Sequence, residues 1–580
     1  MSSPSADIDR PAEDRSARAR RLPPSPLLPG SELLLLALGA IALAVAMFWP
    51  LALHLDTDLP KDLGDPLSQA WQLAWGAHAI VDQPLSFFQA NQFWPLPDTL
   101  AFSDALVGYA PLDFLGRGVT AAIVRYNVIF LLTSALAFAG PYLLARELGV
   151  RPLAAAVAGA AFAYAPWRLE QGGHLHILSS GGIALALFLL LRGYRRGAGD
   201  TGGAALVAAG WVVVAWQVAI GFSLGLPFLV ALAAGGMLAA IVWWRRGRPA
   251  LPRRLVTATV AGVAFVLVLC VVLGRPYLRV QHDHPQSQRS ERTIATYSAG
   301  PAIFLASSEL NPIWGRASDG VRDGLNAVPE QTLFPGLVVL LLAIAGALWP
   351  PWPRAVRIGL VAAAGVFAVL SLGFETAGAG RYLPYRLLYE TIPGWSGMRV
   401  PERLNVFTSL ALALLAAAGA ARLLAALRQR DGVLASAAGV VLVVLILAEG
   451  AGMTPGRWYP HPTAPPAPAG LAGLPAPLLQ LPAGPQDNRR YLLWSADGLP
   501  KMVNGRSSLT PKATGAILRA ATGFPDAASV ARLRRLGVRT VVLHRTVADG
   551  TLWEDWRERP VVGLGITRVV DGPLVVYELR

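Results

Sequence analysis

Charge and cysteine are both scarce in this chain of 580 residues. The one cysteine, Cys270, lies inside an apolar run, so no intramolecular disulfide can form and any external domain has to fold without one. Charged residues make up 15% of the chain, whereas soluble proteins have about 25%. Hydrophobic residues make up 54%. These proportions exclude an ordinary soluble protein and indicate one that lies largely in a bilayer.

A continuous basic surface is also missing, although the net charge is +14. The arginines occur in short groups between apolar runs, at 15–21, 192–196, 245–254 and 422–430. That distribution is typical of cytoplasmic loops and not of a nucleic-acid-binding face. No paired Cys/His spacing suited to a metal occurs. The sequence therefore predicts no nucleic-acid partner and no dedicated metal site, and it leaves a divalent metal ion open as a cofactor at the carboxylates.

What the chain does have is long apolar segments. A segment of about 18–22 such residues crosses the roughly 30 Å of hydrocarbon in a bilayer. We predict about 11 spans of this kind. They lie at 31–53, 120–145, 152–167, 177–193, 204–223, 226–244, 255–274, 334–350, 355–373, 404–427 and 433–452. The first is longer than the apolar part of a signal peptide, so we interpret it as an uncleaved span.

The arginine-bearing loops determine the predicted topology. If the Arg-rich tail 1–30 is cytoplasmic, these short loops all fall on the cytoplasmic side, as the positive-inside tendency requires. The long connections then lie outside, at 54–118, 275–333, 374–403 and beyond 453. Long loops on a rigid scaffold tend to carry function. We therefore expect a multi-pass plasma-membrane protein whose working face is extracytoplasmic.

The composition changes after the multi-span part, 31–453. Residues 454–485 are rich in Pro and Ala and indicate a linker. Residues 486–580 contain an amphipathic helix at 526–537 and runs typical of strands. The predicted strands lie at 490–494, 538–544 and 572–579. The predicted fold class is a polytopic α-helical membrane protein with a small extracytoplasmic α/β domain at its C-terminus.

The first external loop carries two tryptophans directly after the first span, in DLPKDLGDPLSQAWQLAWGAHAI (58–80). From Leu67 the apolar residues recur at i, i+3, i+4 and i+7, which predicts an amphipathic helix. Trp71 and Trp75 lie on its apolar face, so we expect the helix to lie in the membrane interface and to line a groove for a lipid. Asn91, later in the loop, is a candidate for contact with a substrate.

The carboxylates of this loop allow two interpretations. Asp65 precedes Pro66 at the start of the predicted helix, where it can act as a cap and interact favourably with the helix dipole. Alternatively, it is a fixed carboxylate beside the membrane that serves as a general base. Asp62 and Asp58 are weaker candidates for that role. Asp104 either partners Asp65 or caps a helix that begins directly after it.

Other polar residues lie near the external ends of later spans. Arg168, His174 and His176 follow the third predicted span, where we expect polar contacts with a lipid headgroup or a sugar. Two histidines at i and i+2 do not share a helix face, and no HExxH spacing accompanies them, so a metal site is not predicted there. Glu330 lies just before the eighth predicted span and is a further candidate for substrate contact.

Arg399 and Arg403 lie just before the tenth predicted span, on the external side. External arginines at a membrane boundary run against the positive-inside tendency, so they need a partner. A phosphate or pyrophosphate headgroup fits, because a guanidinium group binds it bidentately. Alternatively, the two arginines form structural ion pairs, Arg399 with Glu402 or Arg403 with Glu390.

The chain resembles the GT-C superfamily of integral-membrane glycosyltransferases, and within it a group of large bacterial membrane proteins with an external C-terminal domain. The resemblance rests on the order of several stretches between about residue 55 and residue 545. They include LGDPLSQAWQLAWGAHAI, ANQFWPLPDTLAFSDAL, FAYAPWRLEQGGHLH, PEQTLFPGLVVL, LLYETIPGWSGMRVPERL and KMVNGRSSLTP. It implies a multi-span bundle, an essential acidic residue in the first external loop, and transfer of a sugar from a polyprenyl-phosphate-linked donor outside the cytoplasm.

The resemblance also implies residue roles. Asp65 matches the loop acid and would be the general base, with Asp62 as second choice; the family often has two adjacent acids here, whereas Leu63 and Gly64 separate these two. Arg399 or Arg403 would stabilise the departing phosphate, although a small residue is expected where Glu402 stands. Asp104 and Glu330 would orient the acceptor or assist a metal. The acceptor would be an envelope glycan, lipid or protein.

Three other functions remain open at this point. An acyl- or phosphotransferase that acts on a similar lipid would need a nucleophile or a metal cluster, and the sequence shows neither. A non-catalytic envelope scaffold would use the C-terminal domain to bind a partner. A transporter of lipid-linked glycans would need ionisable residues inside its spans, and the predicted spans have almost none near their middles. A glycosyltransferase is the function that the sequence favours.

Overall fold

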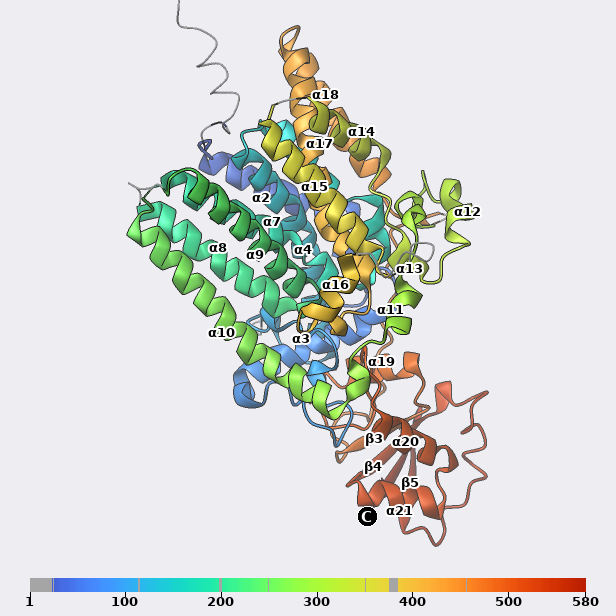
Figure 1. The fold of residues 1–580 in the computed structure, drawn as a ribbon. Coiled ribbons are helices and arrows are strands. Elements are labelled where there is room, and N and C mark those ends of the chain that lie inside the picture. Colours follow the sequence, from blue (N-terminus) through green and yellow to red (C-terminus); the bar gives the residue numbers. More distant parts are fainter. Residues whose placement is uncertain are drawn as a thin grey trace, which may run out of the picture.

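The computed structural model describes residue 23 and residues 25–579, apart from 113–114, 198–200, 249, 350, 375–383 and 455. Most of the predicted Arg-rich tail, at 1–22, lies outside the described residues, as does part of the predicted external loop 374–403. The described chain is mostly helical, and a small sheet near its C-terminus lies at one end of a bundle of long helices (Figure 1).

Nine helices of the described chain are long and apolar enough to cross a membrane. Their helical cores are α2 (Gly30–Met47), α4 (Val119–Glu147), α7 (Gly181–Arg196), α8 (Thr201–Ile220), α9 (Phe222–Arg245), α10 (Arg253–Asp283), α15 (Arg354–Ser371), α17 (Asn405–Arg428) and α18 (Gly432–Glu449). Two shorter apolar helices are α5 (Pro152–Ala163) and α14 (Leu337–Leu348). Every predicted span falls on one of these helices, so the prediction of a polytopic helical protein is confirmed.

The predicted bounds differ from the structure at three of these helices. α5 and α14 have 12 residues each, which is about 18 Å of helix. The chain leaves the α-helix at Tyr164, ahead of the 3-10 turn that starts at Pro166, and α14 begins only after Gly336, whose φ is 97°. In contrast, α10 continues to Asp283, past the predicted end at 274, although Pro276 lies inside it.

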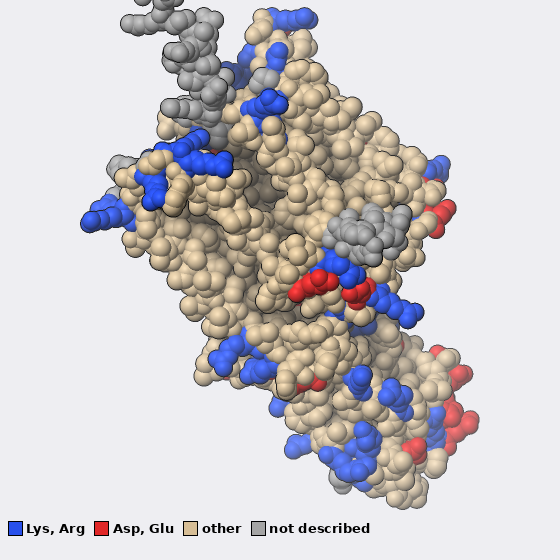
Figure 2. Space-filling view, in the orientation of Figure 1, with Lys and Arg blue, Asp and Glu red and all other residues tan. Residues whose placement is uncertain are grey.

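Helices α4 and α17 form the centre of the bundle. α4 packs against α2, α5 and α7, and α17 packs against α5, α14, α15 and α18. α8 packs between α7 and α10, with α9 beside it. Outer helices expose apolar side chains, for example Leu267, Val268 and Val271 of α10, as expected where lipid is the solvent. Figure 2 shows the resulting broad surface over the long helices, where few charged residues lie between the two ends of the bundle.

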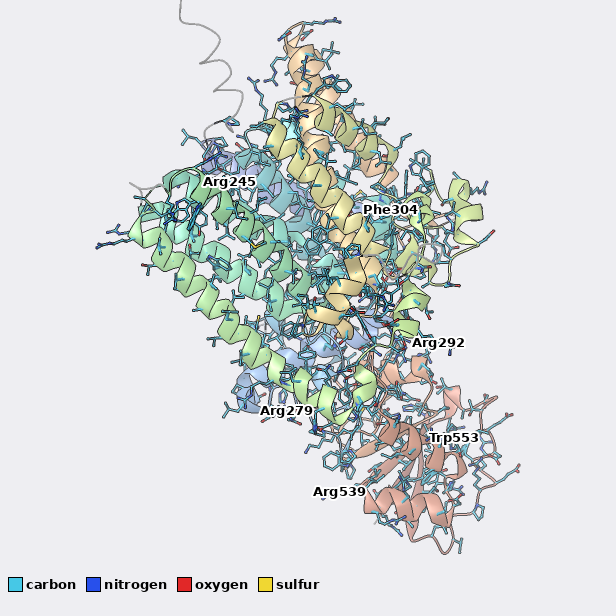
Figure 3. All side chains as sticks on the ribbon, in the orientation of Figure 1. Arg245, Arg279, Arg292, Phe304, Arg539 and Trp553 are labelled. Atoms are coloured by element: carbon cyan, nitrogen blue, oxygen red, sulfur yellow. The ribbon has the colours of Figure 1, made fainter. Side chains whose placement is uncertain are left out.

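The two ends of the bundle differ in what they carry. Figure 3 shows Arg245, at the end of α9, near one end and Arg279, late in α10, near the other. The short elements of the long loops are α3 (Asp65–Asp82), α6 (Leu175–Leu178), α11 (Glu291–Tyr297), α12 (Asp319–Arg322), α13 (Val328–Gln331) and α16 (Pro384–Thr391). Among them, α3, α11 and α16 lie near the end of the bundle that meets the C-terminal domain, and α12 lies at the side of the bundle (Figure 1).

The C-terminal domain (478–579) contains a four-stranded sheet with the order β3-β4-β6-β5. The strands are β3 (Leu478–Leu481), β4 (Thr540–His544), β5 (Ile566–Asp571) and β6 (Leu574–Leu579); β3 and β4 are parallel and the other pairs antiparallel. Its helices are α19 (Pro485–Trp494), α20 (Lys512–Ala520) and α21 (Ala527–Arg535). A two-stranded hairpin, β1 (Met453–Thr454) and β2 (Arg457–Trp458), precedes it.

The predicted strands at 538–544 and 572–579 and the helix at 526–537 are confirmed by β4, β6 and α21. The predicted strand at 490–494 is wrong, because these residues form the last turns of α19, which starts at Pro485 with that proline in its first turn. Strand β3 lies inside the range 454–485 that the sequence marks as linker.

The start of that linker is fixed on the first external loop. Asp58 accepts hydrogen bonds from Thr463 Oγ1 at 2.9 Å and lies 2.9 Å from His461 Nδ1. Backbone hydrogen bonds join the same two segments, from Leu59 N to Pro462 O and from Ala464 N to Thr57 O. Burial alone would raise the pKa of Asp58, but these side-chain hydrogen bonds lower it below its usual value. Asp58 therefore joins loop and linker.

The tryptophans of α3 are buried beneath the C-terminal domain, so the prediction that they lie in the membrane interface is wrong. Trp71 and Trp75 pack with Leu478, Leu492 and Met502 of that domain. Both indole N–H groups have protein partners, Asn91 Oδ1 at 2.9 Å and Phe87 O at 2.8 Å. An apolar helix face can be covered by lipid or by protein, and here protein covers it.

Asn91 is a structural residue of the same interface. It is buried, its Oδ1 accepts from Trp71, and its Nδ2 donates to Ser495 Oγ at 3.1 Å and to Pro500 O at 2.9 Å. Its amide therefore joins the first loop to the C-terminal domain, and the prediction that Asn91 contacts a substrate is corrected. α3 and α19 pack together beside it.

Candidate active site

Asp65 is the first residue of α3, and its side chain does not cap the helix. The N-cap residue is Gly64, and no side-chain hydrogen bond caps the helix there. Asp62 shapes the turn instead, since its Oδ1 accepts from Gly64 N at 2.7 Å. Pro66 and Leu67 turn inward and are buried, which fixes the direction in which α3 starts. The start of α3 therefore fixes the position of the Asp65 carboxylate, and no capping hydrogen bond occupies its oxygens.

Asp65 faces two basic side chains from distant parts of the sequence. Its Oδ2 lies 3.5 Å from His174 Nε2, and its Oδ1 lies 3.2 Å from a terminal nitrogen of Arg489 in α19. The side chain keeps 43% of its surface exposed. Asp65 is thus a carboxylate that is oriented by neighbours and still open to an incoming molecule.

Glu330 and Arg403 form a second, buried pair beside it. Arg403 donates through Nη2 to Glu330 Oε1 at 2.5 Å and through Nε to Oε2 at 3.3 Å, and Gln171 Nε2 donates to Oε2 at 3.3 Å. Burial would raise the pKa of Glu330, but the attraction of Arg403 and His174 outweighs it, so the pKa lies below its usual value. Glu330 is therefore a buried carboxylate kept charged by Arg403.

Two histidines connect the two pairs. His174 Nε2 lies between the carboxylates of Asp65 and Glu330, at 3.5 and 3.8 Å, and its Nδ1 is 3.0 Å from Gln171 Oε1. His176 Nε2 lies 3.0 Å from Arg403 Nη1. Burial lowers the pKa of His174, although both carboxylates oppose that shift. A short 3-10 stretch, Pro166–Gly173, and α6 carry these residues to the site.

Asp104 lies on the other side of His176, with 3.9 Å between the His176 Nε2 and Asp104 Oδ2 atoms. Its Oδ1 accepts from the backbone N of Ser223 at 3.3 Å, at the start of α9. The predicted cap on a helix directly after Asp104 is therefore wrong, because the carboxylate interacts with the N-terminus of α9, where helix dipole and free N–H groups favour it. Burial raises the pKa of Asp104 above its usual value, in spite of these bonds.

Arg399 differs from Arg403 in that it has no acidic partner among the residues that the structure describes. Its guanidinium lies over the ring of Tyr297, 4.9 Å from the centroid. Among the described residues, no carboxylate oxygen lies within 4.0 Å of a guanidinium nitrogen of Arg399, the distance that defines an ion pair. The predicted structural pairs are not found there, since Arg403 binds Glu330 and Glu390 binds Arg386. Arg399 thus keeps a positive charge for another partner.

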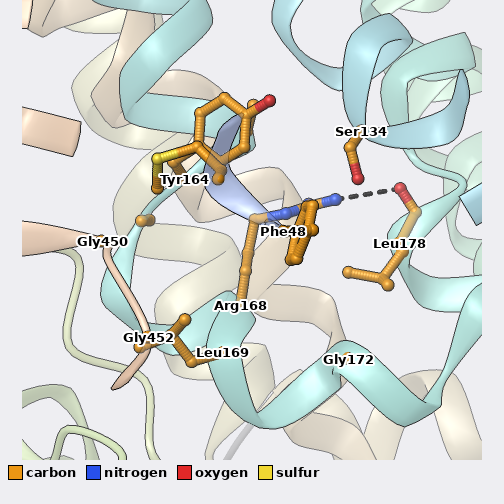
Figure 4. Close-up of a pocket in the computed structure, with 12 residues that line it drawn as sticks. Phe48, Ser134, Tyr164, Arg168, Leu169, Gly172, Leu178, Gly450 and Gly452 are labelled. Atoms are coloured by element: carbon orange, nitrogen blue, oxygen red, sulfur yellow. Dashed lines mark hydrogen bonds between the residues drawn. The ribbon is translucent and has the colours of Figure 1, made fainter. Parts of the chain in front are cut away.

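Arg168 lies outside this group and has a structural role. It is buried, donates to Leu178 O at 2.9 Å and to Ser180 Oγ at 3.2 Å, and its guanidinium is 5.4 Å from the ring centroids of Phe162 and Trp167. The adjacent cavity, of about 20 Å³, has room for roughly one water molecule (Figure 4). Burial lowers the pKa of Arg168 to about 10. The prediction that it contacts a headgroup or sugar is corrected.

Arg489, Gln69 and Gln171 belong to the site and were missed from the sequence. Gln69 Oε1 accepts from Leu175 N at 3.0 Å and its Nε2 lies 3.3 Å from His176 Nδ1, so it orients the histidine segment. Glutamine gives no sequence signal of its own. The sequence places Arg489 just ahead of the predicted strand at 490–494 and gives it no role, whereas in α19 its guanidinium lies 3.2 Å from Asp65 of α3.

The carboxylates and histidines do not form a metal-binding cluster in the part of the chain that the structure describes. They form a row in which basic and acidic side chains alternate, and the row ends near Asp104. Its members are Arg489, Asp65, His174, Glu330 and Arg403. Such a row can accept a proton at Asp65, keep the neighbouring groups in fixed charge states, and present an uncompensated cation at Arg399. These are the elements that a base-assisted group transfer with an anionic leaving group needs.

No protein-family model and no curated protein matches the chain. Among solved structures, arabinofuranosyltransferase AftD from Mycobacteria is similar over 97% of this chain and 40% of its own, with a TM-score of 0.55 and 16% identity. The Archaeoglobus fulgidus oligosaccharyltransferase in the apo form is similar over 88% and 69%, with a TM-score of 0.47 and 15% identity. ArnT from Cupriavidus metallidurans in the apo state is similar over 94% and 97%, with a TM-score of 0.39 and 14% identity.

The likeness to AftD establishes the fold of this chain. AftD is an arabinofuranosyltransferase, and the similarity of fold extends over nearly all residues of this chain. The chain spans 40% of the length of AftD. The GT-C fold that the sequence resemblance predicts is therefore confirmed.

Proposed function

We propose that this protein is a membrane glycosyltransferase that moves a sugar from a polyprenyl-phosphate-linked donor to a cell-envelope acceptor, with Asp65 as the general base. One observation carries the proposal: Asp65 is a fixed, 43% exposed carboxylate within a row of charged side chains. Glu330 and Asp104 in the same row are 8% and 16% exposed. Among these three carboxylates, Asp65 is therefore the one best placed to meet an acceptor.

The reaction balances without a further reactant. The acceptor hydroxyl oxygen attacks the anomeric carbon of the donor sugar and forms the new glycosidic bond. The hydroxyl proton passes to the carboxylate of Asp65. The bond between the anomeric carbon and the phosphate oxygen breaks, and the phosphate leaves with the electron pair. Arg399 stabilises the negative charge on that phosphate, because no carboxylate of the described residues neutralises it.

The remaining charged groups position the reactants in this proposal. Glu330 neutralises Arg403, so we assign that pair to the orientation of His174 and His176 and of the acceptor. Asp104 would bind an acceptor hydroxyl, since a carboxyl group with a raised pKa can donate as well as accept. Asp62, whose Oδ1 is occupied by the turn, remains second choice for the base.

We place the site on the extracytoplasmic side of the plasma membrane. The short loops with arginines, such as the one after Arg245, lie at the opposite end of the bundle from α3 and the C-terminal domain (Figure 3). The positive-inside tendency then puts the N-terminus in the cytoplasm and the site and C-terminal domain outside.

Turnover of a panel of polyprenyl-phosphate sugars by the purified protein tests the proposal. Asp65→Asn keeps the shape of the side chain and removes the base, so we expect turnover to fall about 100- to 10,000-fold while donor binding persists. Asp62→Asn serves as the matched control and should retain most of the activity. Equal turnover by wild type and Asp65→Asn would contradict the assignment of the base.

A non-catalytic scaffold is the second candidate, and the Asp65–Arg489 pair is the observation that favours it. This pair joins α3 to α19 and is consistent with a purely structural contact between loop and domain. The scaffold predicts no turnover of any donor, together with loss of domain docking when the pair is removed. The glycosyltransferase predicts turnover in the wild type, so the same panel separates the two.

A further inference from the structure

Three arginines from distant segments meet where the C-terminal domain joins the loops of the membrane part. Arg289 follows α10, Arg399 precedes α17, and Arg506 lies in the loop before α20. Arg289 connects the other two segments directly. Its backbone N donates to Ser396 O at 2.9 Å, and its guanidinium donates to Ser508 O at 2.9 Å and Ser508 Oγ at 3.2 Å.

These three cations lack the compensation that the other cations of the site have. Among the described residues, no carboxylate oxygen lies within 4.0 Å of their guanidinium nitrogens, the distance that defines an ion pair. Arg403 and Arg489, in contrast, each have such a partner. The Nε of Arg289 is buried without a hydrogen-bond partner. Burial lowers the pKa of Arg289, and repulsion by Arg399 lowers it further. The pKa of Arg506 is also lowered, first by burial and second by repulsion from Arg489.

Like charges brought together without a counter-charge raise the free energy of the folded protein. Such an arrangement is typical of sites that receive an anion, because the anion removes both the repulsion and the unsatisfied donors. The positions of the segments are well fixed: Tyr389 Oη donates to Arg289 O at 2.9 Å, and the backbone N of Arg506 donates to Gln92 Oε1 at 3.1 Å. The repulsion is thus part of the fold.

We infer that Arg289, Arg399 and Arg506 form an oxyanion subsite of phosphate type, to which the C-terminal domain contributes Arg506. This inference rests on the proposed function, because it assigns the group that the subsite binds to a substrate of the Asp65 site. Besides burial, the charge of Arg489 lowers the pKa of Arg506 and the charge of Asp65 raises it, and Arg489 itself contacts Asp65 at 3.2 Å. The subsite therefore adjoins the carboxylate, and the C-terminal domain is a part of the substrate site.

The phosphate group can come from two sources, the lipid-linked donor or a soluble, negatively charged acceptor. Binding by the purified full-length protein in detergent, measured without any turnover, distinguishes them with three probes. A short-chain polyprenyl phosphate tests the donor. The neutral polyprenol of the same length reports on the contribution of the lipid chain. Inorganic pyrophosphate tests a soluble anion.

Arg506→Gln is the primary variant, because no hydrogen bond or ion pair of its guanidinium is found among the described residues, and its loss removes no such contact. We expect its affinity for polyprenyl phosphate to fall about 10- to 100-fold, the usual loss for a charge-assisted bidentate contact. Affinity for the polyprenol should not change. Arg506→Lys should recover part of the affinity, because lysine restores the charge but not the fork of two donors.

Arg532→Gln, an exposed arginine of α21 in the same domain, is the matched control for the loss of one positive charge. It should bind every probe as the wild type does. An Arg506 dependence for polyprenyl phosphate alone assigns the subsite to the donor, and an equal dependence for pyrophosphate assigns it to a soluble anion. Wild-type affinity of Arg506→Gln and of Arg289→Gln for both anions would overturn the inference. Donor turnover by those variants would then leave the proposed function standing.

Discussion

Two carboxylate–arginine pairs flank His174, and they differ in nearly every physical respect. Glu330 and Arg403 are buried and joined by two hydrogen bonds, at 2.5 and 3.3 Å, with Gln171 as a third partner. Asp65 and Arg489 share one contact at 3.2 Å, and 43% of the Asp65 side chain is exposed. The first pair joins two loops of the membrane part, whereas the second joins α3 to the C-terminal domain.

The difference indicates a division of labour. Removing one partner of a buried pair leaves a charge without compensation, so such a pair fixes the structure. A partly exposed pair contributes at most about 1 kcal/mol, so a substrate can displace one partner at little cost. We therefore interpret Glu330–Arg403 as the fixed frame of the site and Asp65–Arg489 as the contact that opens when an acceptor binds.

The largest effect in this comparison is expected for Glu330→Gln. The substitution keeps the shape of the side chain but leaves Arg403 buried without its counter-charge, so we expect a loss of about 3 kcal/mol in the free energy of unfolding. Chemical unfolding in detergent measures it. The double variant Glu330→Gln/Arg403→Gln should be less destabilised than the sum of the two single ones, since it removes both charges.

Glu390→Gln provides the matched control, because Glu390 pairs with Arg386 at 3.4 Å on the surface. It should leave stability unchanged within error.

The pH dependence of the Glu330 contribution to stability has a definite sign as well. The pKa of Glu330 is lower in the folded protein than its ordinary 4.5, so its contribution is present above that value and is lost as the pH falls through the folded pKa. A Glu330→Gln variant as stable as wild type would contradict a fixed frame.

The sequence predicted the membrane part well, because span length and hydropathy are local properties. Among the candidate residues that the sequence predicts, Asp65, Asp104, His174, Glu330 and Arg403 lie together in the structure, and polar residues at the external ends of apolar runs are conspicuous in a sequence. The partners of these residues could not be predicted. Asp65 and Arg489 are 424 positions apart, and nothing in either segment indicates the other.

The errors have a common cause, which is that an apolar face does not specify what covers it. Trp71 and Trp75 were expected against lipid, but Leu492 and Met502 of the C-terminal domain cover them. The segment RYLLW is predicted as a strand because its four consecutive apolar and aromatic residues show no helical period. In α19, Leu493 packs with residues of the membrane part and Tyr491 packs with residues of the C-terminal sheet. A short helix that lies between two apolar surfaces has apolar residues on both of its sides, so its sequence shows no single apolar face.

A smaller effect is expected for Arg489→Gln, which tests the displaceable pair. Stability should fall by less than about 1 kcal/mol, because the pair is partly exposed. Turnover should change more than stability, since Arg489 orients the base directly and lies beside the arginine subsite. Steady-state kinetics on the donor identified by the panel, with Arg519→Gln of α20 as control, measures it. A loss of stability as large as that of Glu330→Gln would show that the two pairs do not differ.

The smallest effect, and the sharpest test of how the pairs are connected, is expected for His174→Gln. His174 lies 3.5 Å from Asp65 and 3.8 Å from Glu330, and glutamine keeps a polar group there without a titratable one. Burial lowers the pKa of His174 below its ordinary 6.5, with repulsion by Arg403 adding to the shift and both carboxylates opposing it.

The sign of the pH effect follows from that lowered pKa. As the pH falls through about 6.5 the unfolded chain binds a proton at this residue before the folded protein does, so wild-type stability declines from there downward. His174→Gln lacks this term. The variant should therefore be less stable than wild type at pH 8, and this deficit should be smaller at pH 5. Unfolding measured at the two pH values tests the expectation. The same difference between variant and wild type at both pH values would mean that His174 has the same pKa in the folded and in the unfolded protein, which would contradict the lowered pKa and the influence of the two pairs on it.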